Sequence, residues 1–153
     1  MKLWQKMLIL TIVIAVPAFM AGPNAPLGAF WGMDPHAPQP TGAQLPLFMI
    51  LGVLDALMFG LGISFLFFGS SLVRAVGGAS AGLTRAAHLS LCWLFIQWWP
   101  HSNMHIVAGD DLGRILLIDY IFHVTIMAGS LILLGFFLAV VRERRAEART
   151  AVA

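Results

Sequence analysis

The sequence predicts an all-α integral membrane protein, built as a bundle of four transmembrane helices. Of its 153 residues, 59% are hydrophobic and only 10% are charged, and the mean hydropathy is +0.87. A soluble domain carries about 25% charged residues, so this chain has too few charges to cover a water-facing surface. The apolar residues also fall into four stretches whose ends carry the basic residues, which is typical of membrane spans.

Four apolar stretches reach or approach the length that a membrane-spanning helix needs. A hydrocarbon core about 30 Å thick requires about 20 helical residues. The second and fourth stretches reach this length, whereas Lys6 and Pro17 interrupt the first and Arg85 lies near the start of the third. We place the spans at about 3–20, 47–72, 79–99 and 112–141, within a single membrane domain that covers 1–153.

The first stretch also has the basic start, apolar run and following small residues of a secretory signal. We expect it to be retained as a helix.

The positions of the basic residues predict the orientation of the chain. Two lysines precede the first span, two arginines flank the link between the second and third, and four arginines follow the fourth. With both termini in the cytoplasm, eight of the nine basic residues face inward and only Arg114 faces outward. The prediction is therefore a multi-pass protein of the cytoplasmic (inner) membrane, N-in and C-in. Its basic tail, 142–153, should continue the last helix into the cytoplasm.

The link between the first two spans, 21–46, is then extracytoplasmic. It holds six of the eight prolines and no basic residue. A connection of this length is usually ordered or functional, and prolines reduce the entropy lost on ordering. We therefore expect a cap over the outer mouth of the bundle, with Trp31 as a contact and His36 as an additional metal ligand. Pro46 suits the first turn of the second span.

The stretch WWPHSNMH, residues 98–105, lies where the third span meets the outer interface. Tryptophan is enriched at that depth. Pro100 disfavours helical geometry at Trp99, so the third span should end there. Pro100 can then begin a short interfacial helix that Gly109 stops. One of the two aspartates that follow should cap the fourth span.

Two pairs of polar residues at helical spacing predict a metal site. His101 and His105 lie one turn apart in the interfacial helix, and Asp119 and His123 lie one turn apart in the outer half of the fourth span. We expect the pairs to converge, with a nitrogen of His123 no more than about 8 Å from one of the other two histidines, which is about twice the separation on a shared zinc. Three or four nitrogen and oxygen ligands suit zinc, copper or non-haem iron.

Each of these residues also has a structural interpretation. His101 and His105 can be exposed interfacial side chains, and Asp119 with His123 can be a hydrogen-bonded pair that fixes the register of the helices. Two further intramembrane polar residues, Asp55 and Gln97, fall at similar depth. We expect them to face the interior of the bundle, either in a hydrogen-bonded network or directed into the same outward-opening pocket as the histidines.

His88 lies near the middle of the third span and has two interpretations. It can form a hydrogen bond to a neighbouring helix. Alternatively, as a neutral imidazole, it can bind a cofactor as an axial ligand of haem iron or of a chlorophyll-type pigment.

Two main functions therefore stay open. The protein is either a membrane protein with an extracytoplasmic His/Asp metal site, or an accessory or structural subunit of a larger respiratory or photosynthetic membrane complex. In the second case its histidines are structural or bind a haem or pigment. A proton or ion path is a third possibility, but no chain of titratable residues reaches the cytoplasmic side.

The predicted partners are the lipid bilayer and other membrane subunits or further copies of this chain. Nucleic acid is not among them, because the basic residues flank spans instead of forming a stripe. The chain carries no motif typical of soluble enzymes, and neither an enzymatic activity nor a substrate can be predicted.

Overall fold

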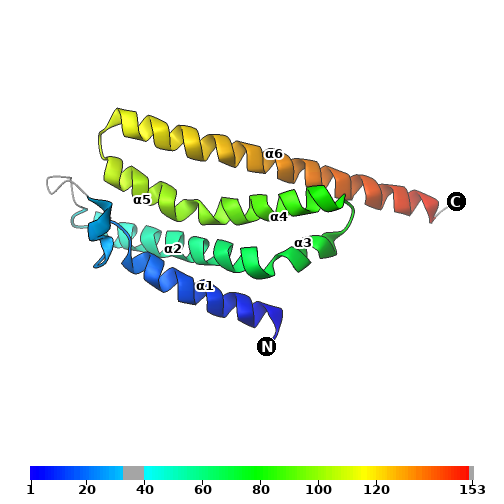
Figure 1. Ribbon diagram of the computed structural model, residues 1–153, viewed down its shortest axis with the longest axis horizontal. Coiled ribbons are helices and arrows are strands. Elements are labelled where there is room, and N and C mark those ends of the chain that lie inside the picture. Colours follow the sequence, from blue (N-terminus) through cyan, green and yellow to red (C-terminus); the bar gives the residue numbers. More distant parts are fainter. Residues whose placement is uncertain (33–39, 152–153) are drawn as a thin grey trace.

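The computed structural model of the protein describes residues 1–32 and 40–151, and every regular element in these ranges is helical (Figure 1). The all-α prediction is therefore confirmed for the described residues. The elements are α1 (Leu3–Met20), the 3-10 helix η1 (Gly28–Trp31), α2 (Gln44–Phe68), α3 (Ser70–Val76), α4 (Ala81–Ile96), α5 (Trp98–Ala108) and α6 (Leu112–Thr150).

Three of these helices, α1, α2 and α6, are long and apolar enough to cross a membrane. They correspond to the first, second and fourth predicted spans. The third predicted span, 79–99, is divided between α4, which has 16 residues, and the first turn of α5. A fourth crossing thus stays a prediction.

The boundary between α4 and α5 corrects one local prediction. We expected a helix to end at Trp99, but Trp99 is helical and the interruption falls at Gln97. The ring of a proline clashes with the carbonyl group four residues earlier, which for Pro100 belongs to Ile96. The clash interrupts the helix one turn before the proline. Pro100 itself then lies in the first turn of α5, where its missing N–H has no intrahelical acceptor to lose.

The helices pack in a row that follows the order of the chain. Helix α1 packs on α2, α2 packs on both α4 and α5, and these two pack on α6. Figure 1 shows α1 and α6 on opposite edges of the row. The predicted bundle of four transmembrane helices is therefore not confirmed.

Small residues on α2 allow its neighbours to approach closely. A Cβ atom on Gly60 would collide with the backbone carbonyl of Thr11 in α1. A Cβ atom on Gly62 would collide with Ile96 of α4. One turn after Gly60, the fully buried Ser64 donates a hydrogen bond from Oγ to the carbonyl oxygen of Met7, at 2.9 Å. Close packing and this polar contact together join α1 to α2.

The ends of the helices largely follow the sequence signals. Gly77 and Gly78 form the bend between α3 and α4, with φ of 70° and 76°. These positive φ angles are unfavourable for a residue that has a Cβ atom. Gly109 ends α5. Of the two candidate caps for the last helix, it is Asp111 that accepts hydrogen bonds from two N–H groups of the first turn of α6, at 3.0 and 3.1 Å.

Helix α6 is the longest element, with 39 residues and therefore a length of about 58 Å. This length exceeds a hydrocarbon core of about 30 Å. The basic tail continues α6 without a break through Thr150, as the sequence predicts.

Candidate metal centre

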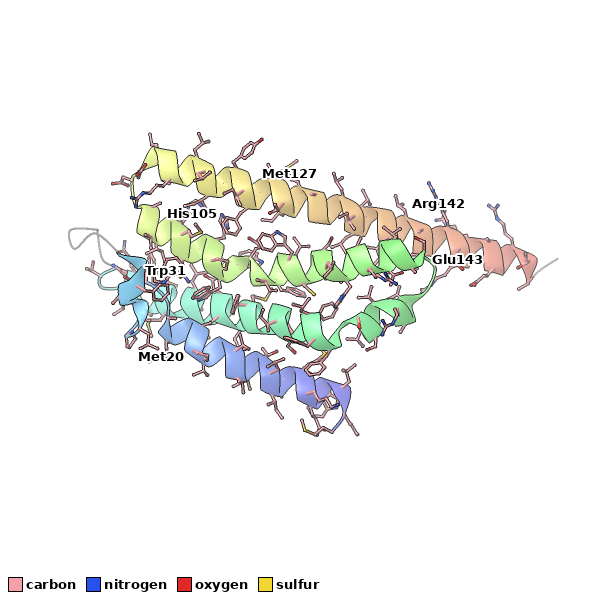
Figure 2. All side chains as sticks on the ribbon, in the orientation of Figure 1. Met20, Trp31, His105, Met127, Arg142 and Glu143 are labelled. Atoms are coloured by element: carbon pink, nitrogen blue, oxygen red, sulfur yellow. The ribbon has the colours of Figure 1, made fainter. Side chains whose placement is uncertain are left out.

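The two polar pairs lie opposite each other between α5 and α6, where Figure 2 labels His105. The Nε2 atom of His105 lies 3.0 Å from Nε2 of His101 on the same helix, and 3.2 Å from Oδ1 of Asp119 on α6. That same Oδ1 atom lies 3.8 Å from Nδ1 of His123. The four side chains thus form one connected group across the two helices.

Three members of this group lie close enough together that they could hold a metal ion. One ligand atom from each of His101, Asp119 and His123 lies within 4.8 Å of the other two. The predicted limit of about 8 Å between the nitrogens of His101 and His123 is therefore confirmed. Two nitrogens that share a zinc can be no more than about 4 Å apart. A shared metal ion would therefore require the three ligand atoms to move closer together than the 4.8 Å observed here.

His105 lies between two of these three candidate ligands. Its Nε2 atom is within hydrogen-bonding distance of both the His101 ring and the Asp119 carboxylate. In this position His105 can act as a fourth donor. It can also orient the other two side chains through a hydrogen bond, as residues beside a metal ligand commonly do.

Aromatic side chains pack against His101 at one side of the group. The ring centroid of Phe122 lies 4.9 Å from that of His101, and Trp93 stacks nearly parallel on Phe122 at 6.0 Å. The indole Nε1 of Trp93 donates a hydrogen bond to Oγ1 of Thr125, at 3.0 Å. These aromatic residues were not among the predicted site residues. Their signal was the spacing of Phe122, three residues after Asp119 on the same helical face.

The side of the group away from Phe122 is open, and the pKa of His101 is shifted in the direction that favours metal binding. The side chains of His105 and Asp119 are 34% and 39% exposed, and that of His123 is 56% exposed. His101 lies beyond the predicted third span. Burial, and to a lesser degree the neighbouring His105 and His123, lower its pKa below the usual histidine value, and the nearby Asp119 opposes this shift only in part. A lowered pKa keeps the imidazole neutral, which is the form that binds a metal.

Asp55 and Gln97 do not join this group, so the shared pocket, which is one of the two interpretations given for them, does not form. Asp55 is 4% exposed and lines a separate cavity of about 120 Å³, together with Trp99 and Asn103 of α5. Gln97 is 3% exposed at the junction of α4 and α5, with its Nε2 3.5 Å from the carbonyl oxygen of Leu94. Trp99 and Asn103 occupy a different face of α5 from His101 and His105, which is why the polar residues separate into two sites.

The described part of the link between α1 and α2 covers the Asp55 side of α5. The ring of Trp31 packs on that of Trp99 with centroids 5.7 Å apart, and its Nε1 donates to the carbonyl oxygen of Ala21 at 2.8 Å. Trp31 and His105 lie on opposite sides of α5 (Figure 2). The expected position of the cap over the histidines is therefore wrong for these residues. His36, the expected additional ligand, lies outside the described residues.

His88 contacts a neighbouring helix, as one of the two interpretations given for it predicts. Its Nε2 atom lies 2.9 Å from the carbonyl oxygen of Phe65 on α2, and the two rings are 5.5 Å apart. This contact already uses one of the two ring nitrogens.

No known protein family matches this chain, and no match was found among curated proteins or among solved structures. Fold and site nevertheless define a class. The protein is all-helical in its described part, has three helices apolar and long enough to span a membrane, and carries a His/Asp group that can hold a metal ion.

Proposed function

We propose that this chain is a multi-pass protein of the cytoplasmic membrane that binds a transition metal ion on its extracytoplasmic side. The observation that carries this proposal is the meeting of three ligand atoms, from His101, Asp119 and His123, within 4.8 Å of one another. These residues come from two helices and are separated by a chain reversal, so their meeting does not follow from local helical spacing alone.

The donor set limits the choice of metal. Two imidazoles and one carboxylate suit zinc, copper or non-haem iron, and they suit calcium or magnesium poorly. If His105 binds as a fourth ligand, the site is closed and the metal is structural or stored. If His105 only orients its neighbours, one position stays free for water or substrate, which is what hydrolytic or redox chemistry requires.

The proposed topology has four crossings with both termini in the cytoplasm. Helix α4 together with the first turn of α5 would make the third crossing. The distribution of basic residues supports this topology, since only Arg114 of the nine would face outward. The metal site would then lie near the outer membrane interface.

Metal analysis of the protein purified in detergent tests the proposal. We expect about one equivalent of a transition metal per chain in the wild type, and a large loss in His101→Ala and His123→Ala, because each variant removes one of three ligands. Met104→Leu is a matched control, since it changes a neighbouring residue of α5 that is not in the group. Equal metal content in all four proteins, or none in the wild type after metal reconstitution, would refute the site.

A second candidate function is that of an accessory subunit in a larger membrane complex. The open row of helices favours it, because the two edge helices are available to partner subunits as well as to lipid. The visible absorption spectrum of the purified protein distinguishes this candidate where a haem or pigment is involved. A haem or chlorophyll band that is lost in His88→Ala but kept in His123→Ala would favour the subunit function.

A further inference from the structure

A cavity of about 400 Å³ lies at the end of the molecule opposite the candidate metal centre. It is bordered by α3, by the Gly77–Gly78 bend and by the first turns of α4. Figure 1 shows this region beside the part of α6 that leads into the basic tail. Under the proposed topology, the cavity opens at the inner membrane interface.

Two arginines from different helices line this cavity. Arg74 comes from the last turn of α3 and Arg85 from the second turn of α4, and both residues are exposed, so the cavity is open to its surroundings. Within residues 1–32 and 40–151, neither guanidinium has a carboxylate within 4.0 Å, and no acidic residue lines the cavity. Two like charges facing one space repel each other, so an anion between them would be stabilised.

Most neighbouring groups add to the positive character of the cavity, although the carboxylate of Glu143 lies beside Gly78 of the bend, outside the lining. The first residue of α4, Ala81, lies in its wall, and the N-terminal end of a helix carries a partial positive charge. The hydroxyl group of Ser70 and the imidazole of His88 add polar atoms. At the C-terminal end of α3, the carbonyl oxygen of Val76 accepts a hydrogen bond from Arg144 at 3.3 Å, which offsets the negative end of that helix.

We infer that this cavity binds a phosphate-bearing anion between Arg74 and Arg85. A guanidinium presents two parallel N–H groups that match a phosphate, and two guanidinium groups match its charge. This phosphate can belong to the headgroup of an anionic phospholipid or to free inorganic phosphate. Under the proposed topology, the cavity lies at the depth of the lipid headgroups at the inner membrane interface.

The double variant Arg74→Gln/Arg85→Gln tests the inference. The full-length protein is placed in nanodiscs of phosphatidylglycerol or phosphatidylcholine, and native mass spectrometry counts the lipids that stay bound. Inorganic phosphate is titrated separately against the protein in detergent. The matched control is Arg145→Gln/Arg149→Gln, which removes the same charge from the tail of α6, outside the cavity.

We expect the wild type and the control to retain phosphatidylglycerol. In the double cavity variant the affinity for the anion should fall about 100-fold, or about tenfold for each arginine removed, because a hydrogen bond to a charged group is lost each time. Preferential retention of phosphatidylglycerol identifies the lipid as the source. Binding of inorganic phosphate by the wild type, lost in the cavity variant, identifies the free ion. If the cavity variant binds both probes as well as the control does, the inference is overturned.

A second variant keeps the test valid if the first one misfolds. Arg74→Lys/Arg85→Lys preserves both charges but removes the paired N–H geometry. We expect binding between that of the wild type and that of the glutamine variant. Binding equal to the wild type would contradict recognition by the two guanidinium groups.

Discussion

The Oδ1 atom of Asp119 connects the two halves of the candidate metal centre. It lies 3.2 Å from the His105 ring on α5 and 3.8 Å from the His123 ring on its own helix. One carboxylate oxygen therefore contacts an imidazole of each helical pair. A carboxylate in this position can bind the metal and fix the orientation of both rings.

Asp119→Asn should weaken metal binding while it preserves the size of the side chain. We expect the affinity for zinc to fall about 10-fold to 100-fold, since the amide is neutral and a poorer ligand. Competition with a chromophoric chelator measures this change. Asp55→Asn is the matched control, because Asp55 lies beside a separate cavity. An equal loss of affinity in the two variants would indicate a general effect of intramembrane carboxylates rather than a ligand role.

At the residue scale, the sequence predicts the site correctly where the signal is local. The spacing of His101 with His105, and of Asp119 with His123, placed each pair on one helical face. It could not place Asp55, whose partners are set by the rotation of α2 relative to α5. That rotation depends on packing between distant segments, such as the contact of Trp99 with Phe59 at 5.2 Å between ring centroids.

At the scale of the helices, the glycines of α2 decide how closely its neighbours pack. Gly60→Ala should lower the free energy of unfolding by about 1–3 kcal/mol, because the new methyl group meets the backbone of α1 instead of a movable side chain. Unfolding in mixed micelles measures the effect. Gly135→Ala in α6 has open space around it and should be neutral or slightly stabilising. A neutral result for Gly60→Ala would show that α1 can shift to accommodate it.

The ends of the helices were easier to predict than the interruption inside the third span. An aspartate before α6 and a glycine after α5 have direct local effects on the backbone. The position of the interruption before Pro100 depended on two opposing rules. One disfavours a helical residue directly before proline, and the other concerns the clash with the carbonyl one turn earlier. In this chain the second effect decides, and Trp99 stays helical.

The whole molecule is an open row of helices, which composition could not have predicted. Hydropathy identifies which segments are apolar, but it does not say which of them touch. The order of contacts here follows pairwise packing, with small residues on α2 facing both α1 and α4. Helix α4 packs mainly on α2 and α6 instead of on its sequence neighbours α3 and α5, so contacts between segments distant in the sequence build the row.

The orientation of the whole molecule has a direct test. Green fluorescent protein fused after Ala153 should fluoresce, and alkaline phosphatase fused there should be inactive, because the basic residues favour a cytoplasmic C-terminus. Fusions after Gly109 should give the opposite pattern. Active alkaline phosphatase at Ala153 would reverse the topology and move the metal centre to the cytoplasmic side.

The unbroken length of α6 has a mechanical consequence. The same 39-residue helix carries Asp119 and His123 near one end and the arginine-rich tail at the other. A hydrogen-bonded helix transmits axial and rotational displacement along its length, and each residue of register corresponds to about 1.5 Å of travel and about 100° of rotation. His101 and His105 belong to a separate helix. The tail and the site are about 40 Å apart, which is the helical rise over some 27 residues. A displacement of the tail along or around the axis of α6 would therefore change the distances between the side chains of α6 and those of α5 in the site.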